Sequence, residues 1–159
     1  MTPLFAQDGS IVEAGLVEQA LDFVRRNTDA DSQLEHGRRI DRPVYPEAVL
    51  REVIVNALVH RDYSIFGTDI TLTIFSDRLE VRSPGSLPNT ATVDALLDGF
   101  RYARNQTLVN VMRDYRYVEF RGMGIPTKVV PGMLEHNGSK PDFLPAEHSF
   151  AVRLWKEKK

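Results

Sequence analysis

The 159-residue chain contains no cysteine, which excludes disulfide bonds and thiolate metal sites. It has no run of about 18 apolar residues that could span a membrane, and its first residues do not follow the pattern of a secretory signal. The formal net charge of −2 gives the whole molecule no electrostatic attraction to nucleic acid or to an anionic membrane. We therefore expect a cytoplasmic protein in a reducing compartment, without a membrane among its partners.

Signatures of several catalytic classes are also missing from the sequence. There is no Gly-x-x-x-x-Gly-Lys-Ser/Thr phosphate loop, which a helicase motor needs, and the chain is far shorter than two motor domains. There is no Ser-His-Asp signature or nucleophile elbow. The histidines are too widely spaced for a metal-binding motif; they are His36, His60, His136 and His148. The sequence thus indicates neither a helicase motor, nor a serine hydrolase, nor a histidine metal centre.

The most informative stretch is an almost continuous apolar segment, which predicts a helix from about Pro46 to Arg61. A helix that is apolar on nearly all sides is buried. Its polar residues Glu52, Asn56 and His60 are four positions apart, so they lie along one narrow stripe. Because burying such groups without partners is costly, the stripe must face a partner, a cavity or a ligand.

The spacing of apolar residues elsewhere predicts the remaining helices and strands. We expect helices over residues 11–26, 92–98, 107–115 and 127–135, the last ended by Asn137-Gly138. We expect strands over residues 69–75, 78–82, 141–143 and 148–155, the first two joined as a hairpin. Residues 27–42 are polar and charged, and we interpret them as a solvated connector; a short strand over 38–40 is the alternative.

Helices and strands cluster separately along the chain, which predicts an α+β sandwich: a mixed or antiparallel sheet with helices on one face. The length indicates a single domain over residues 1–159. Within it we expect an N-terminal helix and connector over 1–44 and a core over 45–155. Both ends resemble cut points, so we expect the chain to be part of a longer protein.

Several motifs occur in an order that resembles one ATPase class. They are Glu52-x-x-x-Asn56-Ala-x-x-His60-Arg-Asp-Tyr63, Ser83-Pro-Gly85, Arg104-Asn105 and Glu119-x-x-Gly122-x-Gly124. They resemble the GHKL ATPases, such as gyrase, histidine kinases and MutL. More narrowly, residues 5–155 are similar to the family called ATP-dependent DNA helicase RecG-related, C-terminal. The resemblance implies a GHKL (Bergerat)-like two-layer sandwich and a place beside Schlafen-like or AlbA-like modules in transcription regulators.

The resemblance also implies a site for ATP and Mg²⁺, with at most slow ATPase activity. Asn56 would bind Mg²⁺ through its side-chain oxygen, and Glu52 would orient or deprotonate the attacking water. His60 would reach toward the phosphates. Other residues implied in nucleotide binding are Gly85, Arg104, Gly122 and Gly124. The alternative is that the polar stripe residues bond one another and nearby loops inside the core.

Two features keep the functional alternatives open. GHKL ATPases carry an Asp-x-Gly whose carboxylate binds the adenine amino group, whereas this chain has Ser83-Pro84-Gly85. This departure favours a degenerate domain without nucleotide, which would mediate protein interaction or homo-oligomerisation. The five arginines over residues 101–121 are more typical of a solvated face, yet they also suit a phosphate lid or direct DNA contact. DNA could also be contacted through flanking domains.

Overall fold

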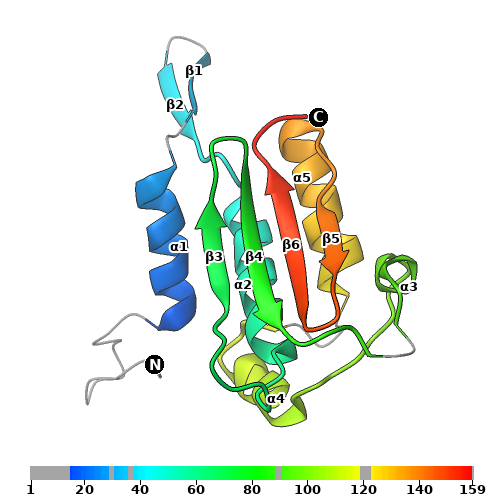
Figure 1. Cartoon of the computed structure of the whole chain (residues 1–159). Helices are drawn as coiled ribbons and strands as arrows, with labels where there is room; N and C mark the ends of the chain where they lie inside the picture. Colours follow the sequence, from blue (N-terminus) through cyan, green and yellow to red (C-terminus); the bar gives the residue numbers. More distant parts are fainter. Residues whose placement is uncertain (1–14, 29–30, 36–37, 89–90, 119–122, 159) are drawn as a thin grey trace, which may run out of the picture. The chain divides into compact units, whose positions relative to one another are not determined.

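Figure 1 shows a computed structural model that describes residues 15–28, 31–35, 38–88, 91–118 and 123–158. The chain forms two compact units, residues 1–44 and 45–159. The boundary between them lies immediately before the helix that carries the polar stripe. Each unit is therefore described separately.

The first unit contains helix α1 (Leu16–Asn27) and an antiparallel hairpin of β1 (Asp31–Glu35) and β2 (Arg38–Arg42). The buried residues Val17, Leu21 and Val24 of α1 lie on one helical face. The predicted helix is confirmed for its described part, and residues 11–14 lie outside the described residues. The interpretation of residues 27–42 as a connector was wrong, whereas the alternative of a short strand over 38–40 agrees with β2. The strands of a hairpin pair through backbone hydrogen bonds, which need no particular side-chain pattern. Because the polar residues of this segment do not alternate with apolar ones, the sequence did not indicate this hairpin.

The second unit is built on a four-stranded antiparallel sheet in the order β3-β4-β6-β5. Its strands are β3 (Thr71–Ile74), β4 (Arg78–Pro84), β5 (Asp142–Pro145) and β6 (Ser149–Trp155). The predicted hairpin and the two C-terminal strands are confirmed. Helices α2 and α5 lie behind the sheet in the view of Figure 1. The predicted α+β class, with an antiparallel sheet and helices on one face, is therefore confirmed.

The helices of this unit follow the predicted spacing closely. They are α2 (Glu47–His60), α3 (Val93–Leu97), α4 (Gln106–Asp114) and α5 (Val130–Asn137). A π-helical turn, Ile125–Val129, leads directly into α5, where Val130 N–H donates to the Ile125 carbonyl. Pro131 has no N–H for the carbonyl four residues before it, so the α-helical register cannot continue back across this turn. The helix predicted from residue 127 therefore begins earlier and is wider at its start.

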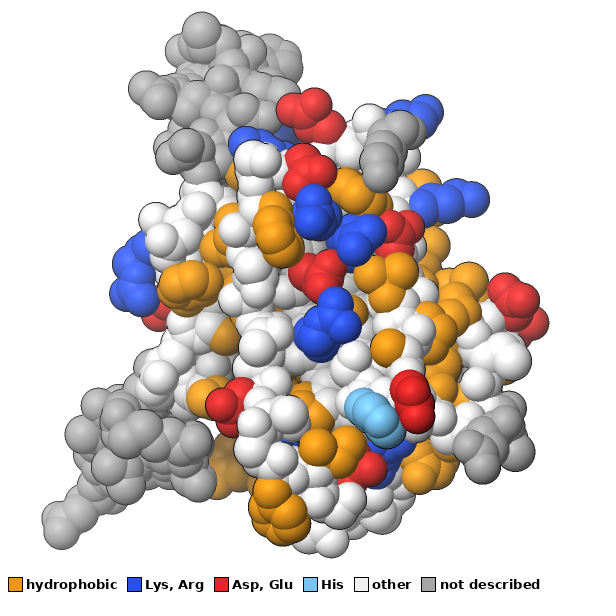
Figure 2. All heavy atoms as spheres, viewed as in Figure 1, with side chains coloured by type: hydrophobic (Ala, Val, Ile, Leu, Met, Phe, Trp, Pro, Cys, Tyr) orange, Lys and Arg blue, Asp and Glu red, His pale blue; other side chains and the backbone are white. Residues whose placement is uncertain are grey.

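The sheet has one apolar face and one charged face. Leu79 pairs with Leu154 and Val81 with Val152, and these buried side chains form the core with the helices. On the other face, Glu80 accepts hydrogen bonds from Arg82 (2.7 Å) and Arg153 (3.1 Å). Although burial raises the pKa of Glu80, these two arginines lower it overall. Figure 2 shows the interleaved acidic and basic side chains on this side of the molecule.

Candidate functional site

A cavity of about 530 Å³ lies within the second unit, on the apolar side of the sheet. Its walls come from α2, from β4 and β6, from the loop of residues 99–104 and from the first helical turns after residue 123. Small-molecule sites in proteins typically have volumes of about 300–1,000 Å³ and combine apolar walls with a few polar groups. This cavity is therefore large enough for a nucleotide-sized ligand.

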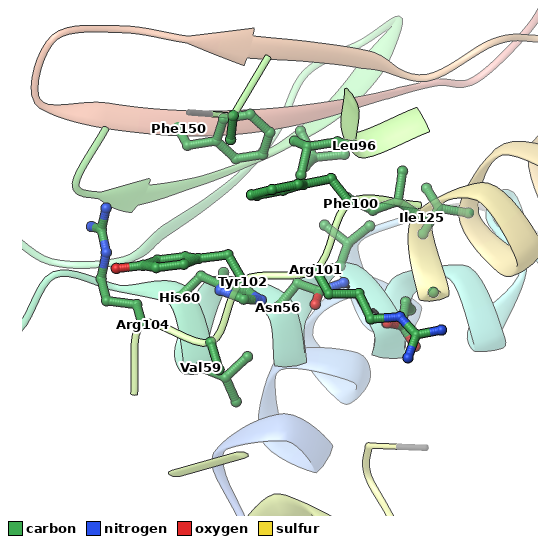
Figure 3. Close-up of a pocket in the computed structure, with 18 of the residues that line it drawn as sticks. Asn56, Val59, His60, Leu96, Phe100, Arg101, Tyr102, Arg104, Ile125 and Phe150 are labelled. Atoms are coloured by element: carbon green, nitrogen blue, oxygen red, sulfur yellow. Dashed lines mark hydrogen bonds between the residues drawn. The ribbon is translucent and has the colours of Figure 1, made fainter. Parts of the chain in front are cut away.

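The polar stripe of α2 lies on the wall of this cavity. Glu52, Asn56 and His60 all line it, as their four-residue spacing predicts for one helical face. Asn56 Nδ2 donates a hydrogen bond to Glu52 Oε1 (3.1 Å). Among the described residues, Asn56 Oδ1 has no hydrogen-bond partner. Figure 3 shows Asn56 and His60 on neighbouring turns of α2, beside the open space of the cavity.

The Glu52 carboxylate is held against the start of the helical segment that leads into α5. Lys128 Nζ lies 3.7 Å from Glu52 Oε2. A methyl group on Gly124 would overlap the Glu52 carboxyl group, so the absence of a side chain at this position makes room for it. A carboxylate at a helix N-terminus is stabilised by the helix dipole. Glycine at position 124 is therefore needed for the Glu52 side chain to fit. This packing role does not depend on any contact between the backbone of the turn and a ligand.

His60 lies in the concave wall at the other end of the stripe. Its side chain is exposed to solvent in the cavity but is surrounded by protein on its other sides. Burial, followed by the positive charge of Arg104, lowers the pKa of His60 below its ordinary value of 6.5. This shift favours the neutral imidazole, which can offer one donor and one acceptor to a ligand.

The turn at Gly85 closes the same end of the cavity. Gly85 has a φ of +109°, which favours glycine, and its N–H donates to the His148 carbonyl (2.9 Å). The Arg104 guanidinium fills the space where a Gly85 side chain would lie. Arg104 Nη2 donates to the Ser86 carbonyl, and Nη1 lies 3.6 Å from Asp62 Oδ2. The turn at Gly85 thus packs against the Arg104 guanidinium, with the Asp62 carboxylate beside it.

Asn105 joins the loop of residues 99–104, here called the basic loop because it carries Arg101 and Arg104, to the end of α2. Its Nδ2 donates to the carbonyls of Val59 and Arg61, both at 2.8 Å. These carbonyls lie in the last turn of α2 and immediately after it, where no intrahelical donor is available. The Arg104-Asn105 pair therefore fastens the cavity loop to the turn at Gly85 on one side and to α2 on the other.

Three aromatic side chains also line the cavity, and the sequence did not lead us to place Phe100 or Phe150 at a site. Phe100 and Tyr102 come from the basic loop and Phe150 from β6, and Figure 3 shows all three around the same space. Phe150 lies opposite Ser83 in the sheet register, which places it near the Gly85 turn. Only that cross-strand register, which a single sequence does not reveal, links Phe150 to the other two.

Lys128 was also missed, although it lies one helical turn after Gly124 and could have been found from that spacing. Gly122 and Arg121, in contrast, lie outside the described residues.

Within the described ranges, no three His, Asp or Glu side chains gather closely enough to hold a metal ion. In this part of the chain, no helix has the length and apolar character needed to cross a membrane.

A structural relative supports the fold of the chain. The crystal structure of the DIP2311 protein from Corynebacterium diphtheriae is similar, with a TM-score of 0.74 and 28% sequence identity. The similarity covers 89% of this chain but only 28% of that protein, so this chain corresponds to little more than a quarter of it. No curated protein matches the sequence.

A family model matches residues 67–154, a range that includes the four-stranded sheet, the Gly85 turn and α3 to α5. The match begins after the polar stripe of α2, so it does not itself cover Glu52, Asn56 or His60. The model is described as "Putative ATP-dependent DNA helicase recG C-terminal". This chain therefore belongs to the RecG C-terminal family, as an ATPase-like domain of that type.

Proposed function

We propose that this domain binds ATP together with Mg²⁺ in the 530 Å³ cavity, as a module of a longer transcription regulator. The observation that carries the proposal is the Glu52–Asn56 pair on the cavity wall, with a side-chain oxygen of Asn56 that no described residue engages. Membership of an ATPase-like family adds support. The domain is not proposed as a helicase motor, because the chain lacks the phosphate loop of such motors.

The two sides of the cavity suit the two ends of a nucleotide. The aromatic side, with Phe100, Tyr102 and Phe150, offers faces on which a base can stack. The cations Arg101 and Lys128 also line the cavity and would attract the triphosphate. The segment after residue 123 contributes the positive end of a helix dipole.

The residues present suit Mg²⁺ only when phosphate is bound as well. Mg²⁺ prefers oxygen ligands, keeps several waters and usually takes one or two protein groups plus substrate phosphates. Asn56 Oδ1 would supply one such oxygen, whereas the Glu52 oxygens are engaged by Asn56 and Lys128. Bound Mg²⁺ would neutralise phosphate charge. We therefore propose that Mg²⁺ binds with ATP and not alone.

Hydrolysis, if it occurs, would depend on Glu52. A carboxylate next to the phosphates can orient or deprotonate water. Here that carboxylate accepts a hydrogen bond from Asn56 on one oxygen and faces Lys128 with the other, so neither oxygen is free to act on water without losing a partner. We therefore propose at most a slow ATPase.

The second candidate function is a protein-interaction or dimerisation module that binds no nucleotide. The observation that favours it is the guanidinium of Arg104 packed beside Gly85, where adenine recognition would need a carboxylate. Direct DNA binding is supported less, because Arg101, Arg104 and Arg113 line the cavity.

A titration separates these functions. We expect ATP with Mg²⁺ to raise the melting temperature, since ATP at 100 times its dissociation constant adds about 2.7 kcal/mol of stability. Asn56→Ala should remove the Mg²⁺-dependent part of that shift. Asn27→Ala, at a position that does not line the cavity, serves as the matched control. No shift at millimolar ATP would refute nucleotide binding, and a salt-sensitive shift with duplex DNA would support the DNA alternative.

A further inference from the structure

A second pocket of about 250 Å³ lies beside the N-terminal half of α2. It is lined by Glu47, Ala48, Arg51, Glu52, Arg116, Tyr117 and Lys128. Glu52 and Lys128 also line the large cavity, so this ion pair separates the two spaces. Among the described residues, the lining side chains include three cations and two carboxylates, which leaves one positive charge in excess.

The excess charge is located on Arg116. Arg51 Nη2 lies 3.0 Å from Glu47 Oε1, and Lys128 Nζ lies 3.7 Å from Glu52 Oε2, so both carboxylates have a cationic partner. The Arg116 side chain is exposed and makes no hydrogen bond or ion pair within the described part of the chain. Its guanidinium is therefore available to an anion that enters the pocket.

The backbone at Arg116 is unusual for this residue type. Arg116 N–H donates to the Arg113 carbonyl and Tyr117 N–H to the Met112 carbonyl, both at 2.8 Å, which is the hydrogen-bond pattern of a Schellman motif after α4. The position that follows the helix in this motif adopts a left-handed conformation, and here Arg116 has a φ of 61°. Glycine ordinarily occupies such a position, because a Cβ is disfavoured there. An arginine at this point gives up backbone stability and places a cation at the pocket.

We propose that this pocket binds a phosphate group, with Arg116 and Lys128 as its main cationic contacts. A guanidinium presents a planar pair of donors that matches two phosphate oxygens, and a lysine ammonium acts as a compact point charge. The phosphate could be free inorganic phosphate or the terminal phosphate of a nucleotide in the adjoining cavity. An anion bound here draws Lys128 away from Glu52, so occupancy of the pocket changes the electrostatic environment of that carboxylate. The proposal does not depend on nucleotide binding, because free phosphate fills the pocket by itself.

The test is an amide NMR titration of the whole chain with sodium phosphate, compared with sodium chloride at equal ionic strength. Phosphate should shift the amides around Arg51, Arg116 and Lys128 in a saturable manner, and chloride should not. Arg116→Gly should weaken phosphate binding at least tenfold while the melting temperature stays equal or rises. Arg116→Asn, which also tolerates the left-handed conformation, should weaken it similarly. Lys156→Ala, which removes one exposed cation outside the pocket, should bind phosphate as the wild type does.

Equal shifts with phosphate and chloride, or unchanged phosphate affinity in both Arg116 variants, would overturn the proposal. A second titration identifies the source of the phosphate. If ATP but not ADP displaces bound phosphate, the terminal phosphate of the nucleotide reaches the pocket; if phosphate and ATP bind together, free phosphate is its ligand. Because the first titration contains no nucleotide, failure of ATP to bind would leave its result unchanged.

Discussion

The contact between Gly124 and Glu52 leads to a prediction that joins the fold to the site. Gly124 has helical backbone angles, φ −59° and ψ −36°, which alanine adopts without strain. A methyl group there would nevertheless overlap the Glu52 carboxyl group. Gly124→Ala therefore combines a gain in helix propensity of about 1 kcal/mol with an overpacking cost of about 1–3 kcal/mol. We expect a net loss of about 1 kcal/mol in the free energy of unfolding.

The effect of Gly124→Ala on the free energy of unfolding should have the opposite sign once the Glu52 carboxylate is removed. In a Glu52→Ala background the methyl group meets no side chain from α2, so Gly124→Ala should stabilise the domain by about 0.4–1 kcal/mol. The difference between the two backgrounds is a coupling free energy of about 1.4–2 kcal/mol, which a double-mutant cycle measures. Urea unfolding followed by circular dichroism gives all four stabilities.

A second glycine of the same helical segment provides the control. A methyl group on Gly132 would contact Val49 Cγ2 at 2.6 Å, so it faces a different residue of α2. Gly132→Ala should therefore destabilise the domain equally with and without Glu52. If Gly124→Ala had the same effect in both backgrounds, the Glu52 carboxylate would not be held against Gly124, and this description of the site would be wrong.

Two further predictions concern the same wall of the cavity. Asn105→Ala removes the donor that serves the carbonyls of Val59 and Arg61. The free energy of unfolding, measured by urea titration, should therefore fall by about 1–3 kcal/mol. An unchanged value would show that water replaces the side chain. The pKa of His60 is lower in the folded protein than in the unfolded chain, so below about pH 6.5 the unfolded chain binds more protons than the folded protein. The free energy of unfolding should therefore decrease as the pH falls from 7 to 5. His60→Gln should flatten that part of the pH profile, and an unchanged profile would argue against the burial of His60 and the influence of Arg104.

Much of the fold could be predicted from local patterns. The alternation of apolar residues over 69–82 and 148–155 indicated three strands of the sheet, and the nearly all-apolar segment before residue 61 indicated α2. These predictions succeeded because burial on one face of a strand, or around a whole helix, leaves a period in the sequence. The hairpin of β1 and β2 left no such period, and the polar composition of residues 27–42 led to the wrong interpretation.

The features of the candidate site also divide into those that local spacing predicts and those that depend on tertiary packing. The four-residue spacing alone predicts that Glu52, Asn56 and His60 share one line, because helical geometry sets the face of residues four apart. That this line faces a cavity, that Gly124 makes room for Glu52, and that Lys128 lies close to its carboxylate follow from the folded structure and not from the spacing. Such contacts join segments more than 60 residues apart, and they depend on how α2, the sheet and the segment after residue 123 pack together. Local spacing carries no information about that packing.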